Sequence, residues 1–439
     1  MKKGIVALLV ILALVVLVSP GIVGRLAEQS VDENLDWATR ESNHLVVTSQ
    51  NFDRGWFSSE GRHRIEVQDG NLRAALLELT GSEDTGSLPA LIIETRLDHG
   101  LVPFSSLTRD GGTLKPGLGS AVSTLSIELA DGQLVPVPGA IYSNVGLNGE
   151  LDSNFVLETG TRTVDDAYFE WGDVDLHIAS SPATGAVVFN GVVDTLAVSN
   201  AKETVRLGAI TFSGDQSPSP FGFSVGDFNM VFDSMAVASP DAPGAEFGRF
   251  SINGTSAVNG DRIDGGATVQ LERSNIPGFG EIGVMATIAF HDIDGAALGA
   301  LNRVLAVLPV VDDAVPTFST VEADLQRVLA AGLRIDFEQV DILLPQGTIE
   351  SSFSFGLGAT DADNFRWTAL LLALDASAHL QVPAELVDLA MMMSPQADAA
   401  VTMGFLKQNG DVYEMEAAYK KGLLTINGAP MPIPLLGVQ

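Results

Sequence analysis

The residues that could carry chemistry are few in this chain of 439 residues, which has six histidines and no cysteine. No two histidines stand four residues apart and no H-E-x-x-H motif is present, so the sequence predicts no metal site made of neighbouring residues. Assembly of a site from distant histidines stays open. The lack of cysteine excludes a thiolate nucleophile, a disulfide framework and a cysteine-ligated zinc or iron-sulfur site, and we expect no cofactor. The histidines are His44, His63, His99, His177, His291 and His379.

Three short motifs match reaction signatures by their letters alone. Ser199–Lys202 (SNAK) fits S-x-x-K, a serine nucleophile with a lysine base, but none of the partner motifs accompanies it. Gly222–Gly226 (GFSVG) fits the nucleophile elbow with Ser224 as nucleophile, and Gly278–Gly283 (GFGEIG) fits a dinucleotide-binding fingerprint. Both signatures need a helix to follow, whereas the residues that follow here alternate as in a strand. We interpret all three as chance matches in a glycine-rich chain.

Two acidic clusters resemble metal-binding loops. His291–Asp294 (HDID) lies where a strand passes into a predicted helix, so we expect Asp292 or Asp294 to serve as a turn residue or a helix cap. Asn259–Gly266 (NGDRIDGG) lacks the spacing and the distal Glu of a calcium loop, and we expect a hairpin loop there. Because no motif has a supporting context, the sequence predicts a protein that is not an enzyme. The alternative is a hydrolase that uses carboxylates dispersed among the 55 acidic residues.

Asn51–Val67 (NFDRGWFSSEGRHRIEV) concentrates aromatic and basic residues in a chain that has only 24 Lys and Arg in total. The residues on either side of the stretch have the composition of strands, and Gly55 lies in what looks like turn chemistry. We interpret it as a hairpin that Trp56 helps to close over the core, with Arg54 paired to an acid or a carbonyl. A ligand-binding role for Arg54 is the alternative.

The N-terminus has the pattern of a membrane anchor. Lys2 and Lys3 precede the uncharged residues 4–24, which at about 1.5 Å per residue span roughly 31 Å as a helix, close to the hydrocarbon thickness of a bilayer. The positive-inside rule then leaves the N-terminus in the cytoplasm and the body outside. The alternative is a cleaved signal peptide with its apolar run at Ile5–Val18. Residues 1–24 are thus the predicted anchor, and residues 25–43 a juxtamembrane stalk.

Composition and charge favour a β-rich body that does not bind nucleic acid. The chain is 46% apolar with 45 glycines, which favours a sizeable core built from sheets. A formal net charge of −31, with no basic stripe, repels phosphate-rich partners. The predicted fold class is mainly β with a few short helices, in extended or curved antiparallel sheets behind one N-terminal transmembrane helix.

Alternating apolar residues predict the strands of the body, and leucine-rich stretches predict its few helices. A hairpin is expected from Val401 to Gly428, with Val401, Met403 and Phe405 alternating before the turn at Asn409-Gly410. The predicted strands include residues 65–67, 72–76, 174–178, 228–232, 267–271, 282–290 and 333–337, and the predicted helices are residues 297–308, 320–331 and 383–393.

Two Pro- and Gly-rich stretches suggest how the body divides. Gly214–Pro220 (GDQSPSP) and Ala238–Glu246 (ASPDAPGAE) are predicted to be long surface loops. They divide the body into an N-terminal β-rich half, residues 44–215, and a C-terminal β-rich half with short helices, residues 216–439.

Three stretches resemble a known family. Val47–Val67, Arg96–Leu107 and Tyr419–Leu435, in this order behind an N-terminal anchor, are similar to the YdgA-like bacterial envelope proteins, a family of unknown function. The family's R-G-aromatic, H-G and G-x-L-T-x-N-G elements match eight residues of this chain, for which we expect structural roles. These are Arg54, Gly55, Trp56, His99, Gly100, Gly422, Asn427 and Gly428.

The resemblance implies an inner-membrane anchor and a periplasmic body in a Gram-negative cell, and it brings no catalytic residues. Together with the lack of reaction motifs, it leads to the hypothesis of a non-enzymatic envelope protein that binds a protein or a lipid. Its expected contacts are the inner membrane through residues 4–24 and an envelope protein or lipid acyl chains. A second alternative is a groove that handles lipids, as in AsmA-like proteins. If the leader is cleaved, the body is secreted to the periplasm.

Overall fold

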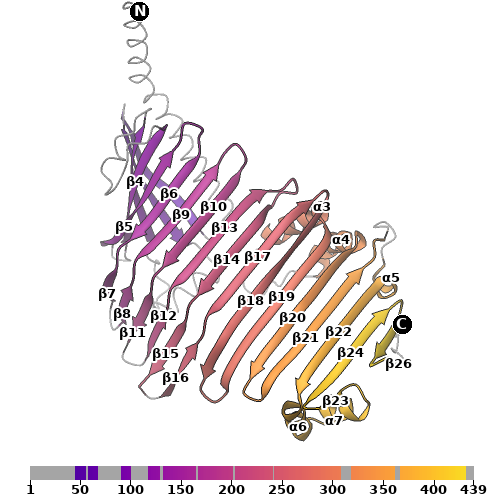
Figure 1. Cartoon of the computed structure of the whole chain (residues 1–439). Coiled ribbons are helices and arrows are strands. Elements are labelled where there is room, and N and C mark those ends of the chain that lie inside the picture. Colours follow the sequence, from indigo (N-terminus) through magenta and orange to yellow (C-terminus); the bar gives the residue numbers. More distant parts are fainter. Residues whose placement is uncertain are drawn as a thin grey trace, which may run out of the picture. The chain divides into compact units, whose positions relative to one another are not determined.

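A computed structural model of the chain describes residues 45–55, 58–67, 90–99, 117–128, 132–164, 167–200, 203–240, 242–307, 318–360 and 366–431. These residues form a mainly β protein with five short helices in the described ranges, which confirms the predicted mainly β body with a few short helices (Figure 1). The chain divides into two compact units. The described strands of unit 1 come from residues 45–160 and 172–193, and those of unit 2 from residues 161–171 and from residue 194 onward.

Unit 1 is an antiparallel sheet whose strands pair in the order β1-β2-β3-β4-β5-β6-β9-β10. Its alternation of apolar and polar residues suits a sheet with two different faces. The strands are β1 (Leu45–Arg54), β2 (Ser58–Val67), β3 (Ala90–His99), β4 (Gly119–Glu128), β5 (Leu134–Val145), β6 (Leu151–Leu157), β9 (Val174–Ser181) and β10 (Ala186–Val193).

Unit 2 contains a long antiparallel run, β13-β14-β17-β18-β19-β20-β21-β22-β24-β25-β26, and β23 pairs with β24. The run consists of β13 (Ile210–Pro218), β14 (Ser224–Phe232), β17 (Phe250–Asn259), β18 (Arg262–Ile276), β19 (Gly280–Asp294), β20 (Leu333–Leu344), β21 (Gly347–Leu357), β22 (Leu374–Pro383), β23 (Lys407–Asn409), β24 (Val412–Lys420), β25 (Leu423–Ile426) and β26 (Ala429–Met431).

Shorter strands of unit 2 pair in the order β8-β11-β12-β15-β16, and β16 also contacts β18. They are β8 (Ala167–Trp171), β11 (Leu196–Ser199), β12 (Thr204–Leu207), β15 (Met235–Ser239) and β16 (Ala242–Phe247), and β7 (Gly160–Val164) precedes them in the chain.

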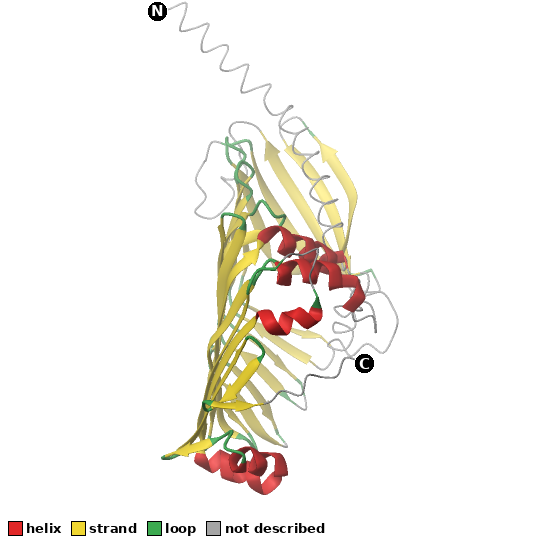
Figure 2. Cartoon of the chain, turned by 90° about the vertical axis from the view of Figure 1, so that its right-hand side faces the viewer, coloured by secondary structure: helices red, strands yellow, loops and turns green. Residues whose placement is uncertain are grey.

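Helices α3 (Gly295–Val307) and α4 (Phe318–Ala330) lie on one side of the strands, as Figure 2 shows. Ala297 on α3 and Val328 on α4 pack with Leu333 of β20 into a buried cluster, so the two helices cover one end of the sheet of unit 2. Asp294 Oδ1 accepts a hydrogen bond from the Ala297 N–H at 2.8 Å, which confirms a capping role for this aspartate. The other helices are α5 (Trp367–Ala373), α6 (Ala384–Met393) and α7 (Pro395–Thr402).

The structure confirms the strand predictions in the described ranges and corrects three details. Gly214–Pro218 is the second half of β13 rather than a loop. The strand can include Pro218 because this residue is its last, where the missing N–H of proline is tolerated. Ala238–Glu246 contains the end of β15 and most of β16. Val401 lies in α7 and Met403 in a turn, so the first arm of the Asn409-Gly410 hairpin is only the short β23.

The predicted membrane segment at residues 4–24 and the predicted stalk at residues 25–43 lie outside the described ranges. The strand predicted at residues 72–76 also lies outside them. Among the residues that are described, no helix combines the length and the apolar character needed to cross a membrane.

Candidate functional site

Two of the motifs that the sequence singled out meet in unit 1. Arg54 ends β1, and its cross-strand partner is Ser59 on β2; Ser59 in turn lies opposite Leu97 on β3. His99 stands two residues beyond Leu97 and therefore on the same face of the sheet. Ser59 Oγ and His99 Nε2 are hydrogen-bonded at 3.1 Å. The hairpin element and the His-Gly element are thus joined through side chains.

The Ser59–His99 pair has the residue types of a nucleophile and its base. However, Ser59 is 1% exposed and His99 is 3% exposed, so both side chains are buried. A buried hydrogen bond of this kind instead fixes β2 against β3. At Gly55, whose N–H donates to the Ser58 carbonyl, an added Cβ would lie 2.7 Å from that oxygen, so the turn requires glycine. Trp56 and Gly100 lie outside the described residues.

Basic residues of the same hairpin are paired with acids of β2, β3 and β4. Arg64 Nε donates to Glu128 at 2.6 Å, and Arg64 also pairs with Glu66. The Glu128 hydrogen bond is the main reason that the pKa of Arg64 is raised. Arg62 lies 3.5 Å from Glu94. Some of the basic residues that are concentrated in this hairpin therefore form ion pairs within the sheet.

The other face of β1 to β4 forms a polar cavity of about 760 Å³. Arg96 lies 3.7 Å from Asp98, a carboxylate that the sequence reasoning did not single out and that is only 8% exposed as a residue. The cavity carries both signs of charge, with carboxylates in excess over the two arginines. It is lined by Asn51, Asp53, Glu60, Gly61, Arg62, Glu94, Thr95, Arg96, Asp98, Val122 and Thr124.

The C-terminal motif supplies two tight turns. Lys421 and Gly422 have φ of 51° and 83°, and Asn427 and Gly428 have φ of 50° and 79°. Hairpins need such left-handed conformations in two-residue turns. The Asn427 side chain donates to the carbonyls of Gly404 and Phe405 and accepts from the Glu416 N–H. These residues shape and hold the end of the sheet.

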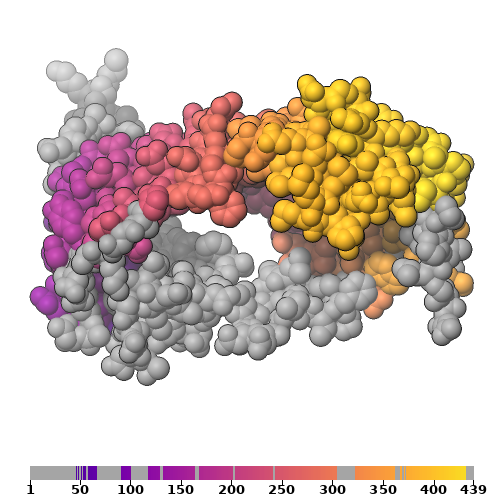
Figure 3. All heavy atoms as spheres, turned by 90° about the horizontal axis from the view of Figure 1, so that it is seen from below, coloured from indigo at the N-terminus to yellow at the C-terminus, as the bar shows by residue number. Residues whose placement is uncertain are grey.

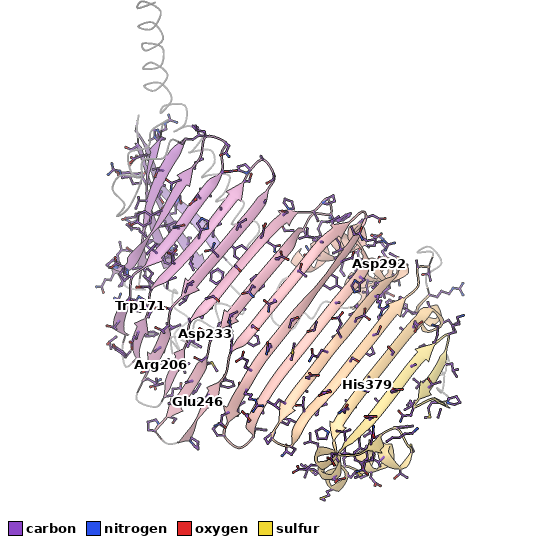
Figure 4. The ribbon with its side chains drawn as sticks, in the orientation of Figure 1. Trp171, Arg206, Asp233, Glu246, Asp292 and His379 are labelled. Atoms are coloured by element: carbon purple, nitrogen blue, oxygen red, sulfur yellow. The ribbon has the colours of Figure 1, made fainter. Side chains whose placement is uncertain are left out.

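The remaining sequence candidates fall at turns and strand ends. Ser224 begins β14 and Gly280 begins β19, so strands follow both glycine motifs, as predicted. Asp292, labelled in Figure 4, has φ of 60°, and its N–H donates to Asp264 Oδ1 at 2.9 Å, which is the main reason that the pKa of Asp264 is lowered. Asn259 pairs with Arg262 across the hairpin turn that was expected there. Within the described ranges, His, Asp and Glu form no cluster of three or more suited to a metal ion.

Unit 2 carries a surface that sequence periodicity only hinted at. From β14 to β24, residues directly opposite each other form rows across six to eight strands, and three adjacent rows on one face are apolar except for Ser351. We call this the apolar face and define it by three rows. They are Phe232, Phe250, Leu271, Val284, Ile342 and Ile349; Met230, Ile252, Val269, Ala286, Val340, Ser351, Leu380 and Met415; and Phe228, Gly254, Ala267, Ile288, Phe337, Phe353, Ala378 and Ala417.

The opposite face of these strands is polar. Asp341 lies opposite Glu350, and His379 of β22, labelled in Figure 4, lies opposite Ser352 and Glu416. The two faces differ because side chains alternate between them with a period of two along each strand. A sheet of this kind is expected to bury its apolar face against other groups.

The apolar face is not fully buried by the described residues. Val284 is 37% exposed, Ile342 38% and Phe353 42%. The cluster around α3 and α4 reaches Ile335 and Phe355, which belong to the next row beyond Phe337 and Phe353. Large aliphatic and aromatic side chains therefore remain open to solvent beside the end that the helices cover. Contiguous exposed apolar side chains of this kind make the apolar face a candidate binding surface.

Comparison with known proteins gives one match. Residues 1–434 match the model of a family described as a bacterial protein of unknown function, DUF945. No curated protein and no solved structure matches the chain.

Proposed function

The chain belongs to the DUF945 family of bacterial proteins of unknown function, and from this premise we propose that it is a non-enzymatic lipid-binding protein whose apolar face holds acyl chains. In this proposal residues 4–24 anchor it in the inner membrane of a Gram-negative cell, and the body lies in the periplasm. The similarity of its motifs to the YdgA-like proteins is part of the same proposal.

The observation that carries the proposal is the partial exposure of an uncharged apolar surface across eight strands. Adjacent strands lie about 4.8 Å apart, so a row across eight strands is roughly 34 Å long and the row across six strands roughly 24 Å long. A lipid acyl chain occupies half of a hydrocarbon layer about 30 Å thick, or roughly 15 Å. Each row is therefore long enough for an acyl chain laid across the strands. A chain along the first row removes Val284 and Ile342 from water, and a chain along the third row removes Phe353.

The chemistry of the face favours acyl chains over a protein surface. Protein interfaces carry about one hydrogen bond per 100–200 Å². The rows offer few donors or acceptors, because their backbone amides are used within the sheet and Ser351 is the one polar side chain in the three rows. An acyl chain needs no hydrogen bond, and it leaves no polar group unpaired against this surface.

Photo-crosslinking in the full chain tests the proposal. Ile342 and Phe353 are each replaced with a benzoyl-phenylalanine, and the matched controls are Asp341 and Ser352, the preceding residues, which face the other way. After irradiation of intact cells, mass spectrometry of the purified protein should find phospholipid attached at positions 342 and 353 and not at 341 and 352. Peptide adducts alone at 342 and 353 would identify a protein partner instead. Equal lipid labelling on both faces would mean mere closeness to a membrane.

A further inference from the structure

A second exposed apolar surface lies on the helical hairpin of α6 and α7, away from the apolar face. These helices stand at one end of the strands in Figure 1, and the view from below in Figure 3 faces this part of the chain. Leu389 is 48% exposed, Met392 84%, Met393 78% and Met403 68%. We call these four residues the methionine patch.

The outward side of α6 is unusually rich in apolar residues for a surface helix. Val387 is the buried residue of α6 and marks its inward side. Leu389, Met392 and Met393 lie within about 100° of one another on the helical circle, on the outward side. A helix that packs on a sheet normally turns charged or polar residues to solvent. Here three large apolar side chains share the outward side with Glu385, and methionine side chains adapt their shape to different partners.

The charge around the methionine patch selects the partner. From Ala384 to Leu406 the only charged residues are Glu385, Asp388 and Asp398, and all three are exposed. A membrane surface with anionic lipids is repelled by these carboxylates. A second copy of the patch is disfavoured for the same reason, because two copies bring six carboxylates together. A partner that carries both apolar and basic side chains complements the methionine patch and the carboxylates near it.

We propose that the methionine patch docks a partner protein through an amphipathic segment whose apolar side chains are flanked by Lys or Arg. The apolar side chains enter between the methionines, and the basic side chains pair with Glu385, Asp388 and Asp398. This interaction does not depend on lipid binding by the apolar face, so either one can fail without the other.

The experiment uses the full chain, which has no cysteine and so allows a single labelling site. Met393→Cys carries a polarity-sensitive fluorophore, and phosphatidylcholine vesicles are present throughout. The probe is an 18-residue Lys/Leu amphipathic peptide, and the matched peptide has Ser in place of Leu. The Lys/Leu peptide should shift the emission to the blue and the Lys/Ser peptide should not. Equal shifts with both peptides, or blue emission before any peptide is added, would overturn the proposal, since they indicate bulk charge attraction or burial in the membrane or another copy.

Variants separate the patch from the overall acidity of the protein. In peptide anisotropy measurements, the double variant Met392→Ser with Met393→Ser should weaken binding of the Lys/Leu peptide by roughly tenfold or more. Phe279→Ser removes a side chain that is 75% exposed in the turn between β18 and β19, and it should leave the affinity unchanged. Unchanged affinity in the double variant, with its thermal midpoint also unchanged, would refute the docking site.

Discussion

At the scale of single residues, Asn427 joins three chain segments. Its backbone has φ of 50°, a conformation that side-chain-bearing residues other than Asn and Asp seldom adopt. Its side chain donates to the Gly404 and Phe405 carbonyls at 2.9 and 3.0 Å and accepts from the Glu416 N–H at 2.9 Å. One amide group therefore ties the segment after α7 to β24 and, through its own turn, to β25.

We predict that Asn427→Ala lowers the free energy of unfolding by about 2–3 kcal/mol, because it removes three hydrogen bonds and places alanine at positive φ. Asn409 is the matched control, since it also precedes a glycine in a hairpin. Its side chain makes one exposed bond, to Glu414 at 3.1 Å, so Asn409→Ala should lower the free energy by less than about 0.5 kcal/mol. Urea unfolding measures both, and equal losses would contradict the role given to Asn427.

The sequence could place Asn427 and His99 in motifs but could not pair Ser59 with His99. Their contact depends on the register between β2 and β3, whose connection runs through residues 68–89. A slip of one residue would move Ser59 to the opposite face. The spacing of residues along the sequence contains no information on this register. The burial of Ser59, His63 and Asp98 is therefore visible only once the strands are paired.

At the scale of elements, two glycines of α3, Gly295 and Gly299, allow the helix to pack closely against Phe221. A Cβ at Gly295 would lie 2.3 Å from Phe221 Cε2, and one at Gly299 would lie 2.3 Å from the Phe221 carbonyl oxygen. The loop before β14 therefore contacts one side of α3 closely. On α3, Ala297 also packs into the buried cluster with Val328.

We predict that Gly299→Ala destabilises the protein by about 1–3 kcal/mol, because the added methyl group clashes with the Phe221 backbone. The direction of the change in stability is diagnostic, since alanine normally stabilises a helix interior by roughly 0.5–1 kcal/mol over glycine. Gly254→Ala is the control, because its Cβ would meet nothing closer than 3.8 Å. A thermal midpoint that rises in Gly299→Ala would show that α3 can move away from Phe221 without loss.

Sequence periodicity predicted elements better than it predicted their ends. The alternation at residues 228–232, 282–290 and 333–337 is confirmed because each segment turns one apolar face to the same side of a sheet. Val401, Met403 and Phe405 alternate too, but this stretch directly follows the Pro395 start of α7, and the helix continues through Val401. A short apolar stretch fits both the helical period of 3.6 and the strand period of two, so tertiary packing decides which structure forms.

At the scale of the whole molecule, the net charge of −31 must be carried outside the rows of the apolar face. In unit 2 this places acids next to each other on the polar face. Asp341 lies directly opposite Glu350, and like charges in such cross-strand pairs are destabilising. Added salt relieves this repulsion, since the Debye length falls from about 30 Å at 0.01 M to about 3 Å at 1 M.

We therefore predict that the thermal midpoint of the protein rises with NaCl, and that Glu350→Gln raises it most at low salt. Removing the charge opposite Asp341 should stabilise the protein by about 0.2–1 kcal/mol at 0.01 M NaCl, and the gain should vanish near 1 M because the charge is then screened. Glu416→Gln is the control, since Glu416 lies opposite His379 rather than an acid and should give no such gain. Calorimetry in a salt series measures these differences. If Glu350→Gln still raised the thermal midpoint at high salt, the gain would come from the β-propensity of the new side chain. Repulsion between acidic residues would then not limit the stability of this sheet.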